Sequence, residues 1–244
     1  MVKRKYGLKR DLPDHRDHIY KSKFRFFLPR SVDLRPLCSP VENQGELGSC
    51  TANAIVGNLE LLENKYKQSF IDLSRLFIYY NERLIEGTTD QDAGAMIRDG
   101  IKSLVKYGVC PEAEWPYDIT QFTVKPTNPC YVDAKKNVIS EYQRVQDVAS
   151  MINCLASGFP VVIGISVFES FESATVAKTG IVPMPKSDES CLGGHAVLCV
   201  GFDMAKKWFI VKNSWGSGWG DLGFFYLPMD YVKKLSSDMW TISK

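Results

Sequence analysis

The sequence predicts an α+β fold of two lobes. In the first half, apolar residues recur at steps of three and four, which is typical of amphipathic helices, and in the second half they form short runs typical of strands. The change follows Trp115-Pro116-Tyr117, and Asn128-Pro129 then breaks the chain. A helical half followed by a strand-rich half favours two lobes that face each other across a groove.

Three helices are expected in the first half, over residues 50–66, 73–84 and 96–107. The first has one apolar face, formed by Ala52, Ile55, Val56, Leu59, Leu62 and Tyr66. Gly108 follows the third, where a glycine can take the left-handed conformation that ends a helix. Four apolar runs predict strands in the second half, at residues 161–167, 196–202, 208–212 and 223–227. A short helix is expected at 151–156.

The composition excludes several classes of protein. A chain of 244 residues suits one large domain or two small lobes, and 45% apolar residues can form a substantial core. The net charge of +2 gives no reason to expect a nucleic-acid or membrane-surface partner. No apolar run approaches the length of a transmembrane helix. We therefore expect a globular protein with no nucleic-acid or membrane partner.

The seven cysteines show no CxxC pair, so a zinc site is not expected. If Cys50 is a free nucleophile, six cysteines remain, an even number that is compatible with disulfides. We favour buried thiols in a reducing compartment over that alternative. Residues 1–10 are basic but lack the apolar run of a secretory signal, which favours an intracellular or virion-associated protein. No metal or other cofactor is expected.

Residues 1–27 are charged and turn-rich. They end in three phenylalanines, Phe24, Phe26 and Phe27. A polar stretch that ends in apolar rings favours an extension packed along the body of the protein and across a cleft. An ordinary structured arm without a regulatory role is the alternative. His15 and His18 have no further ligand nearby, so we do not expect them to bind a metal.

Residues 44–50, QGELGSC, place a thiol at the start of the first expected helix. Backbone amides and the helix dipole favour an anion there, so we expect a lowered pKa for the Cys50 thiol and a better nucleophile at neutral pH. The side-chain amide of Gln44, six positions earlier, can point an N–H at the same place and stabilise an oxyanion.

His195 is the one histidine in the body of the chain, because the other two lie in the N-terminal extension. It follows Gly193-Gly194 and is expected to open an apolar strand, with the glycines keeping the approach to the imidazole open. Asn213 follows the next strand, and its oxygen can accept the imidazole N–H and orient the ring. Trp215 can shield that hydrogen bond from water. The surrounding glycines and tryptophans also fit a packed turn, and both interpretations can hold.

The motifs QGELGSC, GHAV and KNSWGSGWG, in this order, resemble the papain/cathepsin family of cysteine peptidases. His195 follows Cys50 by 145 residues, within the roughly 130–150 typical of this family, and Asn213 follows it by 163, slightly beyond that range. The resemblance covers about residues 28–227 and is nearest to the compact branch found in bacteria and large DNA viruses.

This resemblance implies a papain-like fold, with a helical left lobe, a β-barrel-like right lobe and an active-site cleft between them. The implied divisions are an extension at 1–27 and a peptidase domain at 28–244, split into lobes at 28–125 and 126–244. The extension is shorter than the helical pro-regions of lysosomal relatives. We expect its residues 13–27 to restrict access to the thiol, as in a zymogen.

Carried over by position, the resemblance assigns Cys50 as the nucleophile and His195 as the base and then the acid. Asn213 orients His195, and Gln44 forms the oxyanion hole with the Cys50 amide. The implied reaction is peptide hydrolysis through an acyl-enzyme, by an endopeptidase that acts as a monomer on extended polypeptides. An exopeptidase or deamidase on the same fold and a catalytically silent binding homologue are the alternatives.

The resemblance also implies five substrate contacts, at Gly94, Gly164, Gly194, Ala196 and Trp215. These would line an apolar specificity pocket whose floor comes from residues 236–238. An acidic floor at Asp238 would instead favour a basic side chain, so specificity stays open.

Several positions depart from the family pattern. Thr51 stands where the family usually has tryptophan, and Gly194 where it often has Asp or Asn. Leu47 stands where it has a cysteine, and residues 90–94 replace a loop that carries another cysteine. The loss of both disulfide positions agrees with a reducing compartment.

Overall fold

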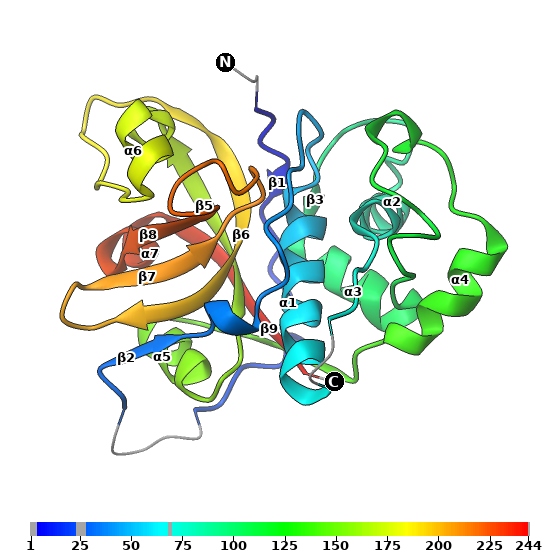
Figure 1. Cartoon of the computed structure of the whole chain (residues 1–244), viewed down its shortest axis with the longest axis horizontal. Helices are drawn as coiled ribbons and strands as arrows, with labels where there is room; N and C mark the ends of the chain where they lie inside the picture. The colour runs from blue at the N-terminus through cyan, green and yellow to red at the C-terminus, as the bar shows by residue number, and fades with distance from the viewer. Residues whose placement is uncertain (1–3, 23–27, 68–69, 244) are drawn as a thin grey trace.

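The computed structural model describes residues 4–22, 28–67 and 70–243. Helices form one lobe and an antiparallel sheet forms the other, so the predicted α+β fold of two lobes is confirmed (Figure 1). The phenylalanines predicted to pack on the body, at 24–27, lie outside the described residues. None of the described helices combines the length and the apolar character that crossing a membrane requires.

Four helices form the helical lobe: α1 (Cys50–Lys67), α2 (Arg75–Glu86), α3 (Ile97–Tyr107) and α4 (Asn128–Ala134). The predicted ends of α1, α2 and α3 are correct to within two residues. α2 begins later than predicted because the Ser74 hydroxyl accepts the Phe77 N–H (3.0 Å) and caps the helix there. Gly108 ends α3 with a positive φ of 74°, which favours glycine, but its ψ of −155° differs from that of the predicted left-handed helical conformation.

The other lobe contains one antiparallel sheet with strand order β4-β9-β5-β6-β7-β8 and with β2 beside β6. Its strands are β2 (Ser31–Asp33), β4 (Glu141–Arg144), β5 (Val161–Phe168), β6 (Cys191–Asp203), β7 (Trp208–Lys212), β8 (Phe224–Pro228) and β9 (Ser236–Ser243). Three short helices complete this lobe: α5 (Val148–Ala156), α6 (Ala174–Thr179) and α7 (Met229–Leu235). The sheet contains all four predicted strands. It also contains β9, which was not predicted because its first three residues are polar.

Strand β6 begins at Cys191, so His195 lies inside the strand and the prediction that it opens the strand was wrong. The two glycines before it continue the ladder, because Gly193 pairs with Val167 of β5 and Gly194 with Ser166. Glycines without side chains leave this part of the strand open to close approach by another segment.

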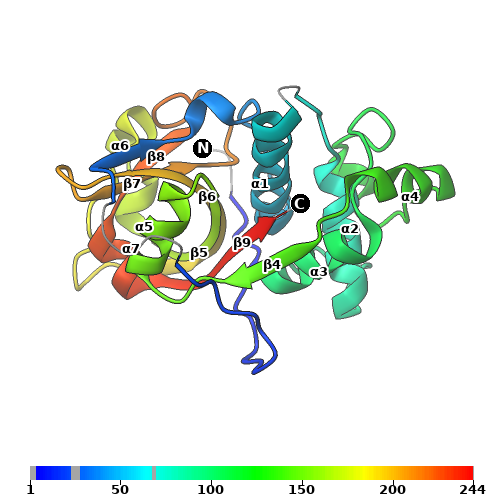
Figure 2. The ribbon, with the colours of Figure 1, turned by 90° about the horizontal axis from the view of Figure 1, so that it is seen from below.

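Helix α1 lies between the sheet and the other helices in both ribbon views (Figures 1 and 2). Its side chains Ile55 and Leu59 are fully buried in one apolar cluster with Leu198 and Trp240 of the sheet. A second cluster fills the opposite face of the sheet around Phe171. Because α1 packs against β6, its first residue is placed at the junction of the two lobes.

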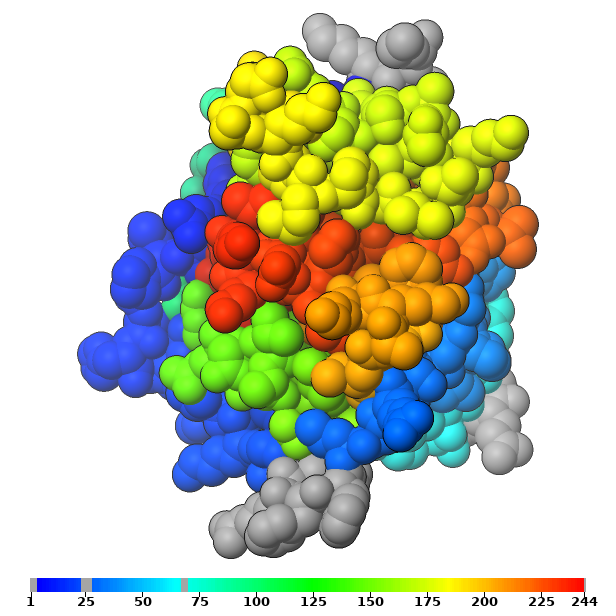
Figure 3. Space-filling view, turned by 90° about the vertical axis from the view of Figure 1, so that its left-hand side faces the viewer, coloured from blue at the N-terminus to red at the C-terminus, as the bar shows by residue number. Residues whose placement is uncertain are grey.

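The N-terminal residues 4–22 run between the two lobes and then along the sheet lobe, where they form the dark-blue edge of the space-filling view (Figures 1 and 3). In this arm, β1 (Leu8–Lys9) pairs in parallel with β3 (Ala95–Met96) of the helical lobe. Two backbone hydrogen bonds, of 2.9 and 2.7 Å, then join residues 18–20 to Arg144 of β4. The arm thus contacts both lobes.

Candidate active site

Cys50 is the first residue of α1 and follows a loop that several hydrogen bonds hold in place. The Gln44 N–H donates to the Ser214 carbonyl (2.9 Å), which joins the loop to the sheet lobe. On the other side, the Tyr117 hydroxyl donates to the Gln44 carbonyl (3.0 Å) and lies 2.5 Å from the Ser49 hydroxyl. These contacts fix the approach to the thiol from both lobes.

His195 and Asn213 form the pair that was predicted from the sequence. His195 Nε2 lies 2.9 Å from Asn213 Oδ1, and both side chains are buried. The same oxygen accepts the Ser214 N–H (2.9 Å), which holds the amide with its oxygen toward the ring. An accepting oxygen requires the proton on Nε2 in the neutral imidazole. The other nitrogen, Nδ1, has no hydrogen-bond partner among the described residues.

The indole of Trp215 stacks on the imidazole of His195, with ring centroids 4.9 Å apart and an angle of 20° between the planes. Trp215 is only 9% exposed, so it shields one face of the imidazole from water. The guanidinium of Arg4 packs over Trp215, 3.8 Å from the centre of the indole ring. Tyr6 of the arm also packs edge-on against both rings, with centroid distances of 6.5 Å to Trp215 and 6.2 Å to His195. Trp215 therefore covers the histidine and contacts the arm through Arg4 and Tyr6.

The Gln44 side chain is oriented at both ends of its amide. The Ser214 hydroxyl donates to Oε1 (2.6 Å), and Nε2 donates to the Leu47 carbonyl (2.9 Å). Because an amide nitrogen carries two hydrogens, one N–H of Gln44 stays available beyond the bond to Leu47. The sequence alone did not identify Ser214 or Tyr117 as supports of this loop, although each lies beside a recognised motif.

The pKa values in this site differ from the expectation for Cys50. Burial raises the pKa of Cys50 to about 11, and backbone hydrogen bonds from Ala196, Gly7 and Thr51 offset this only in part. Burial also lowers the pKa of His195 to about 4, although its hydrogen bond to Asn213 acts in the opposite direction, and Arg4 lowers the pKa further. The helix start was expected to lower the pKa of the thiol, but desolvation by burial outweighs it. With the arm in place, both groups are neutral at pH 7.

Gly7 of the arm contacts the Cys50 thiol through its backbone. Its carbonyl accepts the Ala95 N–H (2.9 Å), and its backbone hydrogen-bonds to the Cys50 sulfur. A Cβ on Gly7 would overlap the Gly48 carbonyl, and a Cβ on Gly94 would overlap the Gly7 carbonyl. Only glycines therefore allow this approach. The covering segment lies N-terminal to residues 13–27, the range that was expected to cover the thiol.

Leu8 occupies the space beside the cleft where the predicted pocket residues lie. A Cβ on Gly164 would stand 2.7 Å from Leu8 Cδ2 and 2.6 Å from Ser237 Oγ, so these atoms line one small space. A Cβ on Gly194 would likewise stand 3.3 Å from Leu8 Cβ. The structure thus brings Gly164, Gly194 and Ser237 together around one apolar side chain of the arm.

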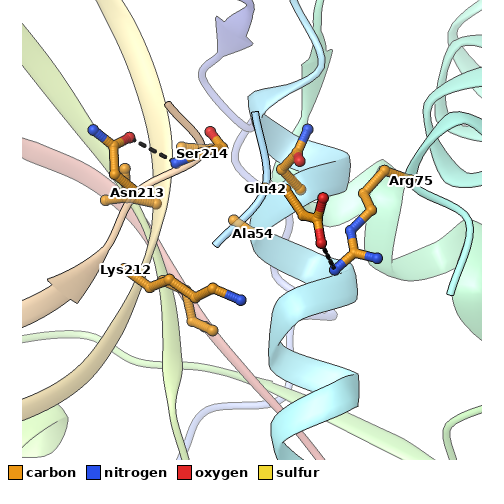
Figure 4. A pocket seen from close by; sticks show the side chains of 10 residues that line it. Glu42, Ala54, Arg75, Lys212, Asn213 and Ser214 are labelled. Atoms are coloured by element: carbon orange, nitrogen blue, oxygen red, sulfur yellow. Dashed lines mark hydrogen bonds and ion pairs between the residues drawn. The ribbon is translucent and has the colours of Figure 1, made fainter. Parts of the chain in front are cut away.

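The remaining predicted contacts lie elsewhere. Asp238 does not form an open acidic floor, because its carboxylate accepts the Asp11 N–H (3.0 Å) and the Arg144 guanidinium (2.5 Å). Ala196 is 1% exposed and borders a polar crevice between the lobes, where Glu42 and Arg75 lie opposite Lys212 (Figure 4). With a volume of about 10 Å³, this crevice holds no more than a water molecule.

All seven cysteines are free thiols in the structure, and most are buried. Cys50 has no cysteine three positions before it, because Leu47 stands there. One pair, Cys110 and Cys130, lies in the helical lobe and is considered below.

Comparisons with known proteins agree with this geometry. The family described as "Papain family cysteine protease" matches residues 28–239. A peptidase C1-like protein of Acanthamoeba polyphaga mimivirus is 48% identical over 231 residues, which are 90% of this chain and 74% of that protein. A viral cathepsin of Spodoptera litura multicapsid nucleopolyhedrovirus is 27% identical, over 81% of this chain and 56% of its own length.

Among solved structures, xylellain, a cysteine protease from Xylella fastidiosa, is 42% identical. It superposes with a TM-score of 0.92 over 100% of this chain and 98% of its own. The family match covers most of the chain, and the overall fold agrees with it. The chain therefore belongs to the papain family of cysteine proteases.

Proposed function

We propose that this chain is an endopeptidase in which Cys50 is the nucleophile and His195 is the base and then the acid. The observation that supports it best is the His195–Asn213 pair (2.9 Å), which fixes the ring through Nε2 and leaves Nδ1 unpartnered among the described residues. Ala196, the next residue of β6, hydrogen-bonds through its backbone to the Cys50 sulfur, so the imidazole and the thiol belong to one site.

In this mechanism, the thiol proton moves to Nδ1 and the thiolate forms a bond to the substrate carbonyl carbon. The developing oxyanion accepts hydrogen bonds from the Cys50 N–H and the free N–H of Gln44. The imidazolium then gives its proton to the leaving amine as the peptide bond breaks. A water molecule, deprotonated by His195, hydrolyses the acyl-enzyme and restores the thiol.

We further propose that the arm inhibits this reaction. A substrate must present a carbonyl carbon to the sulfur, whereas the Gly7 backbone offers the sulfur a hydrogen bond and turns its carbonyl to Ala95. The burial that raises the pKa of Cys50 and lowers that of His195 also disfavours the reactive ion pair. When the arm leaves, water reaches both groups and the charged forms are stabilised.

The arm is fastened to both lobes beyond the cleft. The Asp11 carboxylate accepts the Arg98 N–H of α3 (3.1 Å) and the Trp240 Nε1–H of β9 (2.7 Å). Farther along, Asp17 pairs with Arg98 and Arg144, each at 3.1 Å. This fastening supports a cover that opens by release or cleavage of the arm, as in a zymogen.

Active-site labelling tests these proposals. An epoxide or vinyl-sulfone probe should label the protein slowly when it is intact and faster when residues 1–28 are removed, and Cys50→Ala should abolish labelling. Equal labelling of the intact and shortened proteins, with circular dichroism showing that both are folded, would contradict inhibition by the arm. Failure of both forms to label would overturn the peptidase mechanism and leave a silent binding homologue.

The type of peptidase is tested with peptides blocked at both ends. An endopeptidase cleaves them, whereas an exopeptidase needs a free terminus. Leu8 of the arm lies beside Gly164 and Gly194. This contact supports a preference of the enzyme for an apolar side chain on the substrate residue that precedes the one whose carbonyl is attacked. We therefore expect a blocked peptide with leucine in this position to be cleaved faster than one with lysine.

The proposed mechanism requires one partner, the polypeptide substrate. We also propose that the chain acts as a monomer. The viral relatives support the proposal that it works inside cells or in virus particles. Light scattering of the purified protein tests the first point, and proteomic analysis of cell fractions and purified particles tests the second.

A further inference from the structure

Cys110, Glu114 and Cys130 form a cluster in the helical lobe, well away from the cleft. One carboxylate oxygen of Glu114 and the two sulfurs all lie within 4.8 Å of one another. Cys110 directly follows the segment that ends α3, whereas Cys130 lies in α4, at the outer edge of this lobe in Figure 1. The two thiols are buried and Glu114 is exposed, so the group is open to solvent on one side.

These side chains are the donor types that zinc takes in proteins. Two sulfurs and one carboxylate oxygen supply three of the four positions of a tetrahedral site, and water can supply the fourth. With Zn–S and Zn–O bonds of about 2.3 and 2.1 Å, neighbouring ligand atoms lie about 3.5 Å apart. In the structure, these atoms lie within 4.8 Å of one another, so they must approach by about 1 Å to bind one ion.

Local contacts hold the members of the cluster together. The Cys130 thiol donates to the backbone carbonyl of Glu114 (3.7 Å) and lies 3.2 Å from the Thr127 hydroxyl. The first contact ties the segment that carries Glu114 to α4, so the two sulfurs and the carboxylate stay close to one another.

We propose that Cys110, Cys130 and Glu114 bind one thiophilic divalent cation of the zinc type. Binding releases the thiol protons, and the two thiolates and the carboxylate become the ligands. The ion joins α4 to the segment 110–117. This segment ends in Tyr117, whose hydroxyl contacts the Gln44 carbonyl and the Ser49 hydroxyl beside the nucleophile.

A disulfide between the same two cysteines is the competing explanation. It would use only the sulfurs, would need an external oxidant, and would leave the nearby carboxylate without a role. The absence of a CxxC spacing explains why the sequence did not predict this site, because the ligands are 20 residues apart and only the fold brings them together.

The experiment uses the full chain with Cys50→Ala, so that the catalytic thiol cannot bind the metal. Reduced protein is titrated with Zn²⁺ under equilibrium dialysis, and with Co²⁺, whose thiolate complexes absorb in the near ultraviolet. We expect one equivalent of Zn²⁺, a sulfur-to-cobalt absorption band, and a higher melting temperature with Zn²⁺. Cys110→Ser and Cys130→Ser should each weaken binding about tenfold or more, and Glu114→Gln should weaken it less.

Cys154→Ser is the matched control, because Cys154 is equally buried but lies in α5 of the other lobe. It should leave the stoichiometry and the cobalt band unchanged. Should the cysteine variants misfold, alkylation of the otherwise unsubstituted protein still decides, because Zn²⁺ should slow the modification of Cys110 and Cys130 and not that of Cys154. Unchanged binding in Cys110→Ser/Cys130→Ser, no stoichiometric binding, or a Cys110–Cys130 disulfide in peptide maps of unreduced protein would overturn the proposal.

Discussion

Gln44 shows how a single side chain is prepared for a reaction by its neighbours. Ser214 donates to its oxygen and the Leu47 carbonyl accepts from its nitrogen, so the amide cannot rotate to present its oxygen to the substrate. An oxyanion requires donors, and a flipped amide would repel it. The proposed oxyanion hole thus depends on Ser214 as well as on Gln44.

Gln44→Ala is expected to lower kcat for a blocked peptide by about 100- to 1000-fold, because one preorganised donor to the oxyanion is lost. Both proteins should carry Gly7→Ala, which opens the cleft as argued below, and kcat is measured at saturating substrate. Gln121→Ala, at an exposed glutamine outside the proposed site, is the control and should leave kcat unchanged. A decrease below tenfold would place the oxyanion elsewhere.

At the scale of elements, the arm is the feature that decides access to the site. Strand β1 runs parallel to β3, and its preceding residue, Gly7, passes between Gly48 and Gly94. Three glycine backbones in contact leave no room for a side chain at this crossing. The position of the arm thus depends on the absence of Cβ atoms at these residues.

Gly7→Ala is expected to displace the arm and speed probe labelling of Cys50 by about tenfold or more, because the new Cβ overlaps the Gly48 carbonyl. The measurement is the second-order rate of labelling in the intact chain. Leu12→Ala changes an arm residue that is 66% exposed and should have little effect. Labelling that stays as slow as in the unsubstituted protein would show that the arm does not control access.

Asp11 makes the fastening of the arm sensitive to pH. Burial and the neighbouring Asp238 raise its pKa to about 6, against hydrogen bonds from Trp240 and Arg98. Arg144 also faces it, at 3.8 Å. A carboxyl group whose pKa is raised on docking favours the docked state when protonated, so this contribution is lost as pH rises through about 6.

Release of the arm is therefore expected to become easier between about pH 4 and pH 7, by up to about 3 kcal/mol for a shift of about two pKa units. The measurement is the labelling rate of Cys50 across this range, divided by that of the shortened protein to remove the pH dependence of the thiol itself. In Asp11→Asn, this ratio of labelling rates should no longer rise with pH. An equal rise in Asp11→Asn would assign it to another group.

At the scale of the whole molecule, a buried ion pair lies where the first helix meets the loop before α2. Arg75 and Glu60 are 2.6 Å apart, with side chains 2% and 0% exposed, and Arg75 also approaches Glu42 at 3.4 Å (Figure 4). Glu60 further accepts the Leu73 N–H (3.0 Å). Such a pair holds two elements together, because separating its members would leave an uncompensated charge in the core.

Arg75→Gln is expected to destabilise the protein by about 3 to 5 kcal/mol, because Glu60 would stay buried without its partner. Urea unfolding gives the free energy of unfolding directly. Arg16→Gln removes an arginine whose side chain is 77% exposed and should change it by less than about 1 kcal/mol. Unfolding free energies that agree within error for both variants would show that water replaces the guanidinium.

The sequence by itself predicted the order of the main elements and the candidate reactive groups. The periodicity of residues 50–66 predicts α1 from local pattern. The motifs around Cys50, His195 and Asn213 predict one site because their order and spacing resemble those of the papain/cathepsin family. The overall fold could be predicted for the same reason. The strand β9 could not, since its first three residues are polar and its place between β4 and β5 comes from pairing with distant strands.

Only the tertiary structure decided what occupies the cleft and how the site is charged. Gly7 and Leu8 have no sequence signal, because their fit depends on Gly48 and Gly94, far along the chain. The pKa of Cys50 is likewise raised because the folded chain buries the thiol, and this desolvation outweighs the effect of the helix start that the sequence reveals. Contacts between distant segments and the exclusion of water arise only on folding, so local pattern cannot predict them.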